Sequence, residues 1–97
     1  MAYRLTVSDR ATREIGEAYG WYQEQSVGLG DDFLEALDLQ FQAIIQTPQL
    51  YAQSPRGVRR ALLRRFPYGT FYASKGEIIS ILAVVRTSRS PRRWPRQ

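Results

Sequence analysis

The chain of 97 residues contains neither cysteine nor histidine. Without cysteine it can form no disulfide and no thiolate metal site, as expected of a protein in a reducing cytoplasm. Without histidine it lacks the side chain that most often acts as a general base near neutral pH, so His-dependent triads are excluded. Any catalysis would therefore have to use carboxylates, tyrosine, arginine or the single lysine, Lys75.

Long apolar runs and nucleotide-binding or metal-binding motifs are also absent from the sequence. No run reaches the length of about 18 apolar residues that a membrane span needs. The segment MAYRLTVSD lacks the apolar centre of a signal peptide, and Walker, HExxH, EF-hand and GxGxxG motifs do not occur. The sequence predicts a cytoplasmic protein with no membrane association, no cofactor and no metal.

The two halves of the chain carry opposite charge. Residues 1–50 contain three arginines and eight acidic residues, whereas residues 51–97 contain ten arginines and Lys75 against a single acidic residue, Glu77. The planar guanidinium of arginine favours bidentate contacts to phosphate and carboxylate and stacks on aromatic rings. A basic C-terminal half predicts an anionic partner, which is nucleic acid, an acidic protein segment, or both.

The apolar pattern predicts a single α+β domain over residues 1–97, with the order β-α-α-β-β-β and a basic C-terminal tail at 87–97. Strands are expected at residues 3–8, 58–66, 69–73 and 77–86. We expect the last three strands to form an antiparallel meander, and the first strand to pair with the last. An N-terminal helix hairpin should cover one face of this antiparallel sheet.

The helix hairpin is indicated by two amphipathic segments. Ser8 is the expected N-cap of the first helix, and the second is expected to begin at Asp31 and to end before Pro48. Gly16 and Gly20 are expected to let another backbone approach the first helix closely. The acidic residues of the first half are assigned to solvated helix faces.

Arginines and aromatic residues interleave in the second half of the chain. This composition is typical of surfaces that grip phosphates and stack bases, and also of protein-binding hot spots. We expect these residues to converge on one surface for a target or partner. The candidate residues are Arg59, Arg60, Arg64, Arg65, Tyr68, Tyr72, Arg86, Arg89, Arg93 and Trp94. Four neighbouring residues are assigned to the core instead: Leu62, Leu63, Phe66 and Phe71.

Four segments of the chain resemble the RelE/ParE superfamily of type II toxin–antitoxin toxins, its ParE-like branch in particular. They are WYQEQSVGLGDDFLEAL (21–37), TPQLY (47–51), RRALLRRFPYGTFY (59–72) and ILAVVRTSRSPRRW (81–94). The resemblance implies a growth-inhibiting toxin of the plasmid-stabilisation kind, neutralised by a cognate antitoxin in a hetero-oligomer. ParE-like toxins inhibit DNA gyrase without being enzymes in the ordinary sense, whereas RelE-like toxins cleave mRNA in the ribosome.

The basic residues that RelE-like cleavage uses are matched in part. The resemblance places Arg60 and Arg64 at basic positions of the second strand, and Arg86 or Arg89 at the arginine of the fourth strand. Relatives often carry histidine where this chain has Arg86. These matches are compatible with charge recognition in either branch.

Two positions favour the ParE-like branch. The third strand of RelE-like relatives usually reads Tyr-Arg, where this chain has Tyr68-Gly69. Trp94 lies in the C-terminal aromatic region but cannot act as an acid or base, so a tyrosine with a lowered pKa would have to serve. We therefore expect gyrase inhibition. The alternatives are a ribosome-dependent mRNA endonuclease and a non-toxic nucleic-acid-binding or interaction domain, and catalytic residues are left unassigned.

Overall fold

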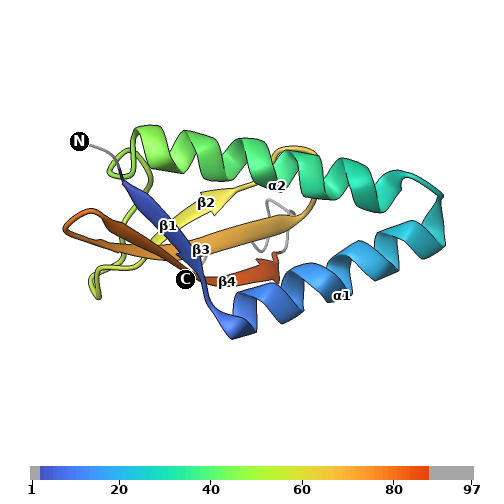
Figure 1. The fold of residues 1–97 in the computed structure, drawn as a ribbon, viewed down its shortest axis with the longest axis horizontal. Coiled ribbons are helices and arrows are strands. Elements are labelled where there is room, and N and C mark those ends of the chain that lie inside the picture. Colours follow the sequence, from blue (N-terminus) through green and yellow to red (C-terminus); the bar gives the residue numbers. More distant parts are fainter. Residues whose placement is uncertain (1–2, 88–97) are drawn as a thin grey trace, which may run out of the picture.

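The computed structural model describes residues 3–87, which form two helices and a four-stranded sheet (Figure 1). The elements are β1 (Arg4–Val7), α1 (Asp9–Gln25), α2 (Leu29–Gln46), β2 (Arg59–Leu62), β3 (Tyr68–Lys75) and β4 (Ile78–Arg86). The predicted element order is confirmed. Neither helix in this part of the chain has the length and apolar content that crossing a bilayer requires. Arg89, Arg93 and Trp94 lie outside the described residues.

The sheet has the strand order β1-β4-β3-β2, so β4 has a neighbour on each side. β1 runs parallel to β4, whereas β2, β3 and β4 form the predicted antiparallel meander. The two helices lie antiparallel over one face of the sheet (Figure 1). Ile79 and Ile81 of β4 are fully buried beneath them. No helix among residues 3–87 covers the other face, which we call the open face.

The helix hairpin turns tightly because Gln23 caps the start of α2. Its Oε1 accepts hydrogen bonds from the backbone N–H groups of Gly28 and Gly30, at 3.0 and 2.7 Å. Gly28 has a φ of 92°, which glycine adopts without strain. A Cβ at Gly30 would lie 2.7 Å from the carbonyl oxygen of Tyr19, so the two helices meet backbone to backbone there. Helix α2 consequently begins at Leu29, earlier than predicted.

The predicted close approach at Gly16 and Gly20 is wrong. A Cβ built at either residue would have no atom within 4 Å. These glycines lie on the exposed side of α1, which packs through Ala11, Ala18 and Tyr22 instead.

An aromatic cluster joins the helix hairpin to the sheet. The ring of Tyr22 lies 5.3 Å from that of Phe33 and 5.0 Å from that of Phe66, between centroids. Phe33 and Phe66 are 5.4 Å apart and nearly perpendicular. All three residues are buried, and such pairs contribute about 0.5–1.5 kcal/mol each beyond the burial of their area. The cluster therefore holds α1, α2 and the turn before β3 together.

Strand β2 ends at Leu62, whereas the sequence predicted a strand to Phe66. Beyond Leu62 the chain turns, because the N–H of Leu63 donates to the carbonyl of Tyr68 at 3.0 Å. The turn directs Phe66 beneath the helices. Of the residues assigned to the core, Leu63 and Phe66 are confirmed, while Leu62 is 38% exposed.

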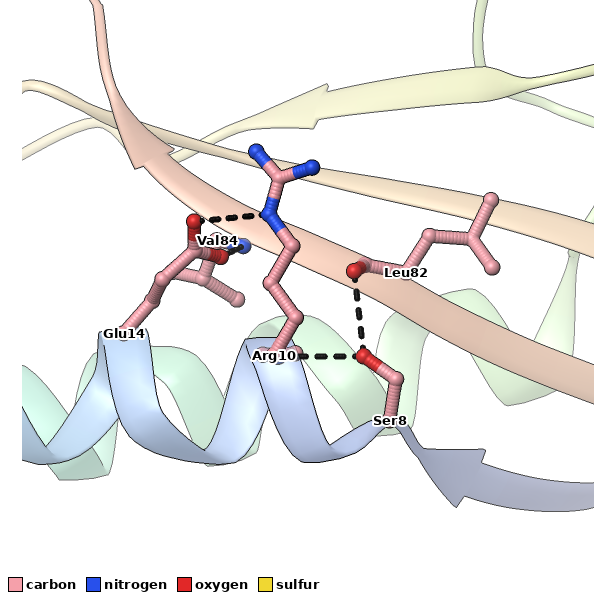
Figure 2. Close-up of polar contacts among 6 residues, drawn as sticks. Ser8, Arg10, Glu14, Leu82 and Val84 are labelled. Carbon is pink, nitrogen blue, oxygen red and sulfur yellow. Dashed lines mark hydrogen bonds and ion pairs between the residues drawn. The ribbon is translucent and has the colours of Figure 1, made fainter.

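Where the short β1 ends, side chains of Ser8 and of the start of α1 form hydrogen bonds with backbone groups of β4, in place of a neighbouring strand (Figure 2). The hydroxyl of Ser8 accepts from the N–H of Ala11, as a helix N-cap does, and donates to the carbonyl of Leu82, both at 3.0 Å. Oε1 of Glu14 accepts from the N–H of Val84 at 2.8 Å. The Glu14 carboxylate thus stands in for a strand carbonyl, so its assignment to a solvated helix face is wrong.

Replacing Glu14 with Ala should lower the free energy of unfolding by about 1–3 kcal/mol, because the N–H of Val84 loses its acceptor. Glu14→Gln keeps an acceptor oxygen and should cost less. Glu17→Ala, one turn along on the exposed side of α1, should change stability by no more than about 0.5 kcal/mol. Urea denaturation of the three variants measures this. Equal midpoints for Glu14→Ala and Glu17→Ala would show that Glu14 does not support β4.

Candidate functional site

The seven candidate residues that lie within the described part of the chain are distributed over several surfaces of the protein. The open face holds Arg60, the turn after β2 holds Arg64 and Arg65, a groove beside α1 holds Tyr68 and Arg86, and Arg59 and Tyr72 point inward. Among residues 3–87, the arginines of the second half of the chain therefore do not share one surface.

The open face is crossed by two rows of cross-strand partners. Residues opposite each other on paired strands project to the same face of the sheet. One row is Arg60, Phe71 and Ala83, and the other is Leu62, Gly69 and Val85. Phe71 is half-buried here, on the face away from the helices, so it belongs to a surface and its assignment to the core is wrong. The centre of the open face is apolar.

A hollow of about 340 Å³ adjoins this apolar centre. The side chains of Arg60 and Phe71 form one side of it, and the loop before β2 forms the other through Ala52 and Val58. The N–H of Arg60 donates to the carbonyl of Ala52 at 3.1 Å, so this loop also protects the edge of β2. An apolar floor with a guanidinium at its rim suits a ligand that is partly apolar and partly acidic.

Arg59 has a structural role. Its guanidinium donates to the carbonyl oxygens of Tyr51 and Gln49, at 2.6 and 3.3 Å, and to Oε1 of Gln53 at 3.2 Å. These three bonds tie the loop that follows α2 to the start of β2. With three of its five N–H donors engaged by this loop, Arg59 is a poor candidate for binding a target.

Tyr72 belongs to the core. Its side chain is fully buried, and its hydroxyl donates to the carbonyl of Pro48 at 2.6 Å. Burial raises the pKa of Tyr72, against the opposing charge of Arg59. Burial likewise raises the pKa of Tyr22. A raised pKa keeps a phenol neutral and makes it a weaker acid, so neither residue is the tyrosine base of lowered pKa that cleavage would require.

The turn after β2 presents its two arginines to α2. Arg65 pairs with Asp32 at 3.2 Å, and its guanidinium lies 5.1 Å from the centre of the Phe66 ring. Both partners of this ion pair are well exposed, so it contributes at most about 1 kcal/mol. Arg64 lines a hollow of about 330 Å³ together with Leu39, which is 61% exposed.

A groove of about 560 Å³, which we call the α1 groove, lies between α1 and the end of β4. Arg86 lines it and places its guanidinium 5.9 Å from the centre of the Trp21 ring, within the range of a cation–π contact. Glu14, Glu17 and Tyr68 complete its walls. The sequence did not single out this groove, although its two glutamates and Trp21 recur at helical spacing beside the buried alanines of α1.

We compared the sequence and the structure with those of known proteins to identify the fold. No protein-family profile and no curated protein sequence matches the chain. A chain from the chromosomal ParDE toxin–antitoxin system of P. aeruginosa superposes with a TM-score of 0.79 and 22% identity, over 90% of this chain and 98% of that one. The chain has the RelE/ParE toxin fold.

Two further structures extend the similarity within this fold. The isolated E. coli RelE toxin superposes with a TM-score of 0.70 and 18% identity, covering 95% of this chain and 92% of that one. A chain of the intact E. coli RelBE toxin–antitoxin complex gives 0.67 and 22%, covering 91% and 100%. The fold class expected from the sequence is confirmed.

Gly69 lies at the position on the open face where the resemblance implies an arginine in RelE-like toxins. A Cβ at this position would lie 3.0 Å from Cδ2 of Leu62 and 3.2 Å from Cγ2 of Thr87. The space above Gly69 is thus filled by two neighbouring side chains. To admit even the Cβ of an arginine, which the resemblance implies for RelE-like relatives, Leu62 and Thr87 would each have to move by a few tenths of an ångström.

Arg59→Ala should lower the free energy of unfolding by about 1–3 kcal/mol, because the carbonyl of Tyr51 loses a charged donor. Arg56→Ala removes an exposed arginine from the same loop and should change stability by about 0.5 kcal/mol or less. Thermal and urea denaturation compare the two variants. If both unfold like the parent protein, the loop does not depend on Arg59.

Gly69→Ala should destabilise the protein by about 1 kcal/mol, because its methyl group crowds Leu62. In a Leu62→Ala background the cost should fall by about 0.5 kcal/mol or more, which a double-mutant cycle in urea measures. Gly16→Ala, in an open helical position, should instead stabilise the protein by about 0.5–1 kcal/mol. The same cost for Gly69→Ala in both backgrounds would contradict the contact.

Proposed function

We propose that the protein is the toxin of a type II toxin–antitoxin system, neutralised by a cognate antitoxin, and that it acts by inhibiting DNA gyrase. Support for the toxin role comes from the fold, since the similar chains come from the ParDE and RelBE toxin–antitoxin systems and the isolated RelE toxin. Such a protein acts in the cytoplasm, where gyrase and ribosomes are, and would serve growth inhibition and plasmid stabilisation.

The observation that carries the choice of gyrase is the filled space above Gly69. Cleavage of RNA requires a cation placed against the developing charge of the phosphate and a group that takes a proton. This chain has no side chain at residue 69, where Leu62 and Thr87 would crowd a Cβ, and the buried Tyr72 has a raised pKa. The open face is therefore better suited to binding a protein than to cleaving a phosphodiester.

The chemistry of the open face also indicates what kind of antitoxin segment would bind it. The apolar centre of this face, with Leu62 and Phe71, would be covered by apolar side chains of the partner, and Arg60 at the rim would pair with an acidic one. We propose an extended or amphipathic acidic segment for this role. A bound antitoxin segment of this kind would prevent the target from binding to the open face.

Purified protein should block supercoiling by gyrase and stabilise cleaved DNA at micromolar concentration. Its expression should arrest growth, and co-expression of an adjacent acidic gene product should relieve the arrest. Transcript cleavage in translating ribosomes with gyrase unaffected would replace this proposal with the endonuclease. Absence of growth arrest would contradict the toxin role altogether.

Arg60→Glu should weaken antitoxin binding by roughly tenfold or more, because it places like charges against each other at the rim of the hollow. Arg56→Glu makes the same charge change on an exposed residue of the preceding loop and should have a smaller effect. Isothermal titration with both variants, each first shown to unfold like the parent protein, measures the difference. Equal losses would indicate that only net charge matters.

A further inference from the structure

The β4 wall of the α1 groove is a strand edge with no strand beside it among residues 3–87. The register of β1 with β4 ends at the pair Val7 and Ile81, five residues before β4 itself ends at Arg86. The carboxylate of Glu14 accepts a hydrogen bond from the N–H of Val84. The carbonyl of Leu82 accepts from the hydroxyl of Ser8, so an extended segment of chain would add backbone contacts only beyond Val84, toward Arg86.

The opposite wall has the chemistry of a site for arginine. Glu17 is exposed and makes no hydrogen bond or ion pair with any described residue. Trp21, one turn further along α1, is 49% exposed. A carboxylate forms charge-assisted bonds to a guanidinium, and an indole offers its face to the same cation, as it does to Arg86.

We propose that the α1 groove is the docking site of the chain's own residues 88–97. The described part of the chain ends at Thr87, directly after Arg86 in the wall of the groove, and the N–H of Thr87 is held by the carbonyl of Pro67 at 2.8 Å. The sequence that follows, SRSPRRWPRQ, has four arginines and no acidic side chain. At about 3.3–3.6 Å per residue it is long enough to follow the whole groove.

Charge decides in favour of the tail over an acidic partner segment. Glu17 would repel an acidic peptide and attract the arginines of the tail, whereas the charge of Glu14 is already paired with Arg10 at 2.9 Å. Trp94 supplies apolar area that can cover Trp21. A docked tail keeps its arginines away from the open face. An acidic partner that binds these arginines would have to draw the tail out of the groove. This inference concerns the chain alone and does not depend on gyrase as the target.

The test uses the absence of cysteine, which makes Gln97→Cys a unique site for a nitroxide label in the full-length chain. With the label oxidised, the amide signals of Ala18, Trp21 and Val84, which line the groove, should lose most of their intensity in two-dimensional NMR spectra. Glu17→Lys should restore them. Glu24→Lys, the same change further along α1 and outside the groove, should not.

High salt should also restore the signals, because the contact is electrostatic. Broadening confined to Leu62 and Phe71 would place the tail on the open face and overturn the proposal. Uniformly weak broadening, or equal effects of Glu17→Lys and Glu24→Lys, would overturn it as well. None of these outcomes requires a toxicity or gyrase measurement.

Discussion

The contact between Tyr22, Phe33 and Phe66 holds the two layers of the protein together. Each ring comes from a different part of the chain, namely α1, α2 and the turn before β3. By drawing Phe66 beneath the helices, the cluster ends β2 early and points the turn arginines toward α2. It also keeps one face of the sheet covered by the helices. A partner protein must therefore bind to the open face, to its edges or to the grooves.

Two consequences of this arrangement bear on function. The open face keeps an apolar centre, where Leu62 and Thr87 fill the space above Gly69, with Arg60 beside it. The shortness of β1 leaves the end of β4 to be completed by Glu14 of α1, which opens a groove on the helix side. The open face is apolar with Arg60 beside it, whereas the groove combines Glu17 with Trp21 and Arg86, so the two surfaces suit different ligands.

Much of the fold could be predicted from the sequence, because period-two and helical patterns report burial directly. The Ser8 cap and the pairing of the first strand with the last are confirmed. The candidate site could be predicted only in part. The alternation of apolar and polar residues through 58–66 predicts a strand. It does not reveal that Phe66 is stabilised more by packing against Tyr22 and Phe33 than by strand pairing. The sequence did not distinguish Arg59 from the neighbouring arginines, because two of its three acceptors are backbone carbonyls of a loop and leave no trace in a pattern of side chains.

The central claim is that the open face, rather than the outer surface of the helices, binds the antitoxin. Methyl NMR of the protein titrated with the proposed antitoxin tests this most directly, since Leu62 and Val85 report on the open face, whereas Leu34 is exposed on α2 and Val27 in the turn between the helices. We predict large shifts for the methyl groups of Leu62 and Val85 and small ones for those of Val27 and Leu34. Shifts confined to Val27 and Leu34, with the open-face methyl groups unchanged, would contradict the claim.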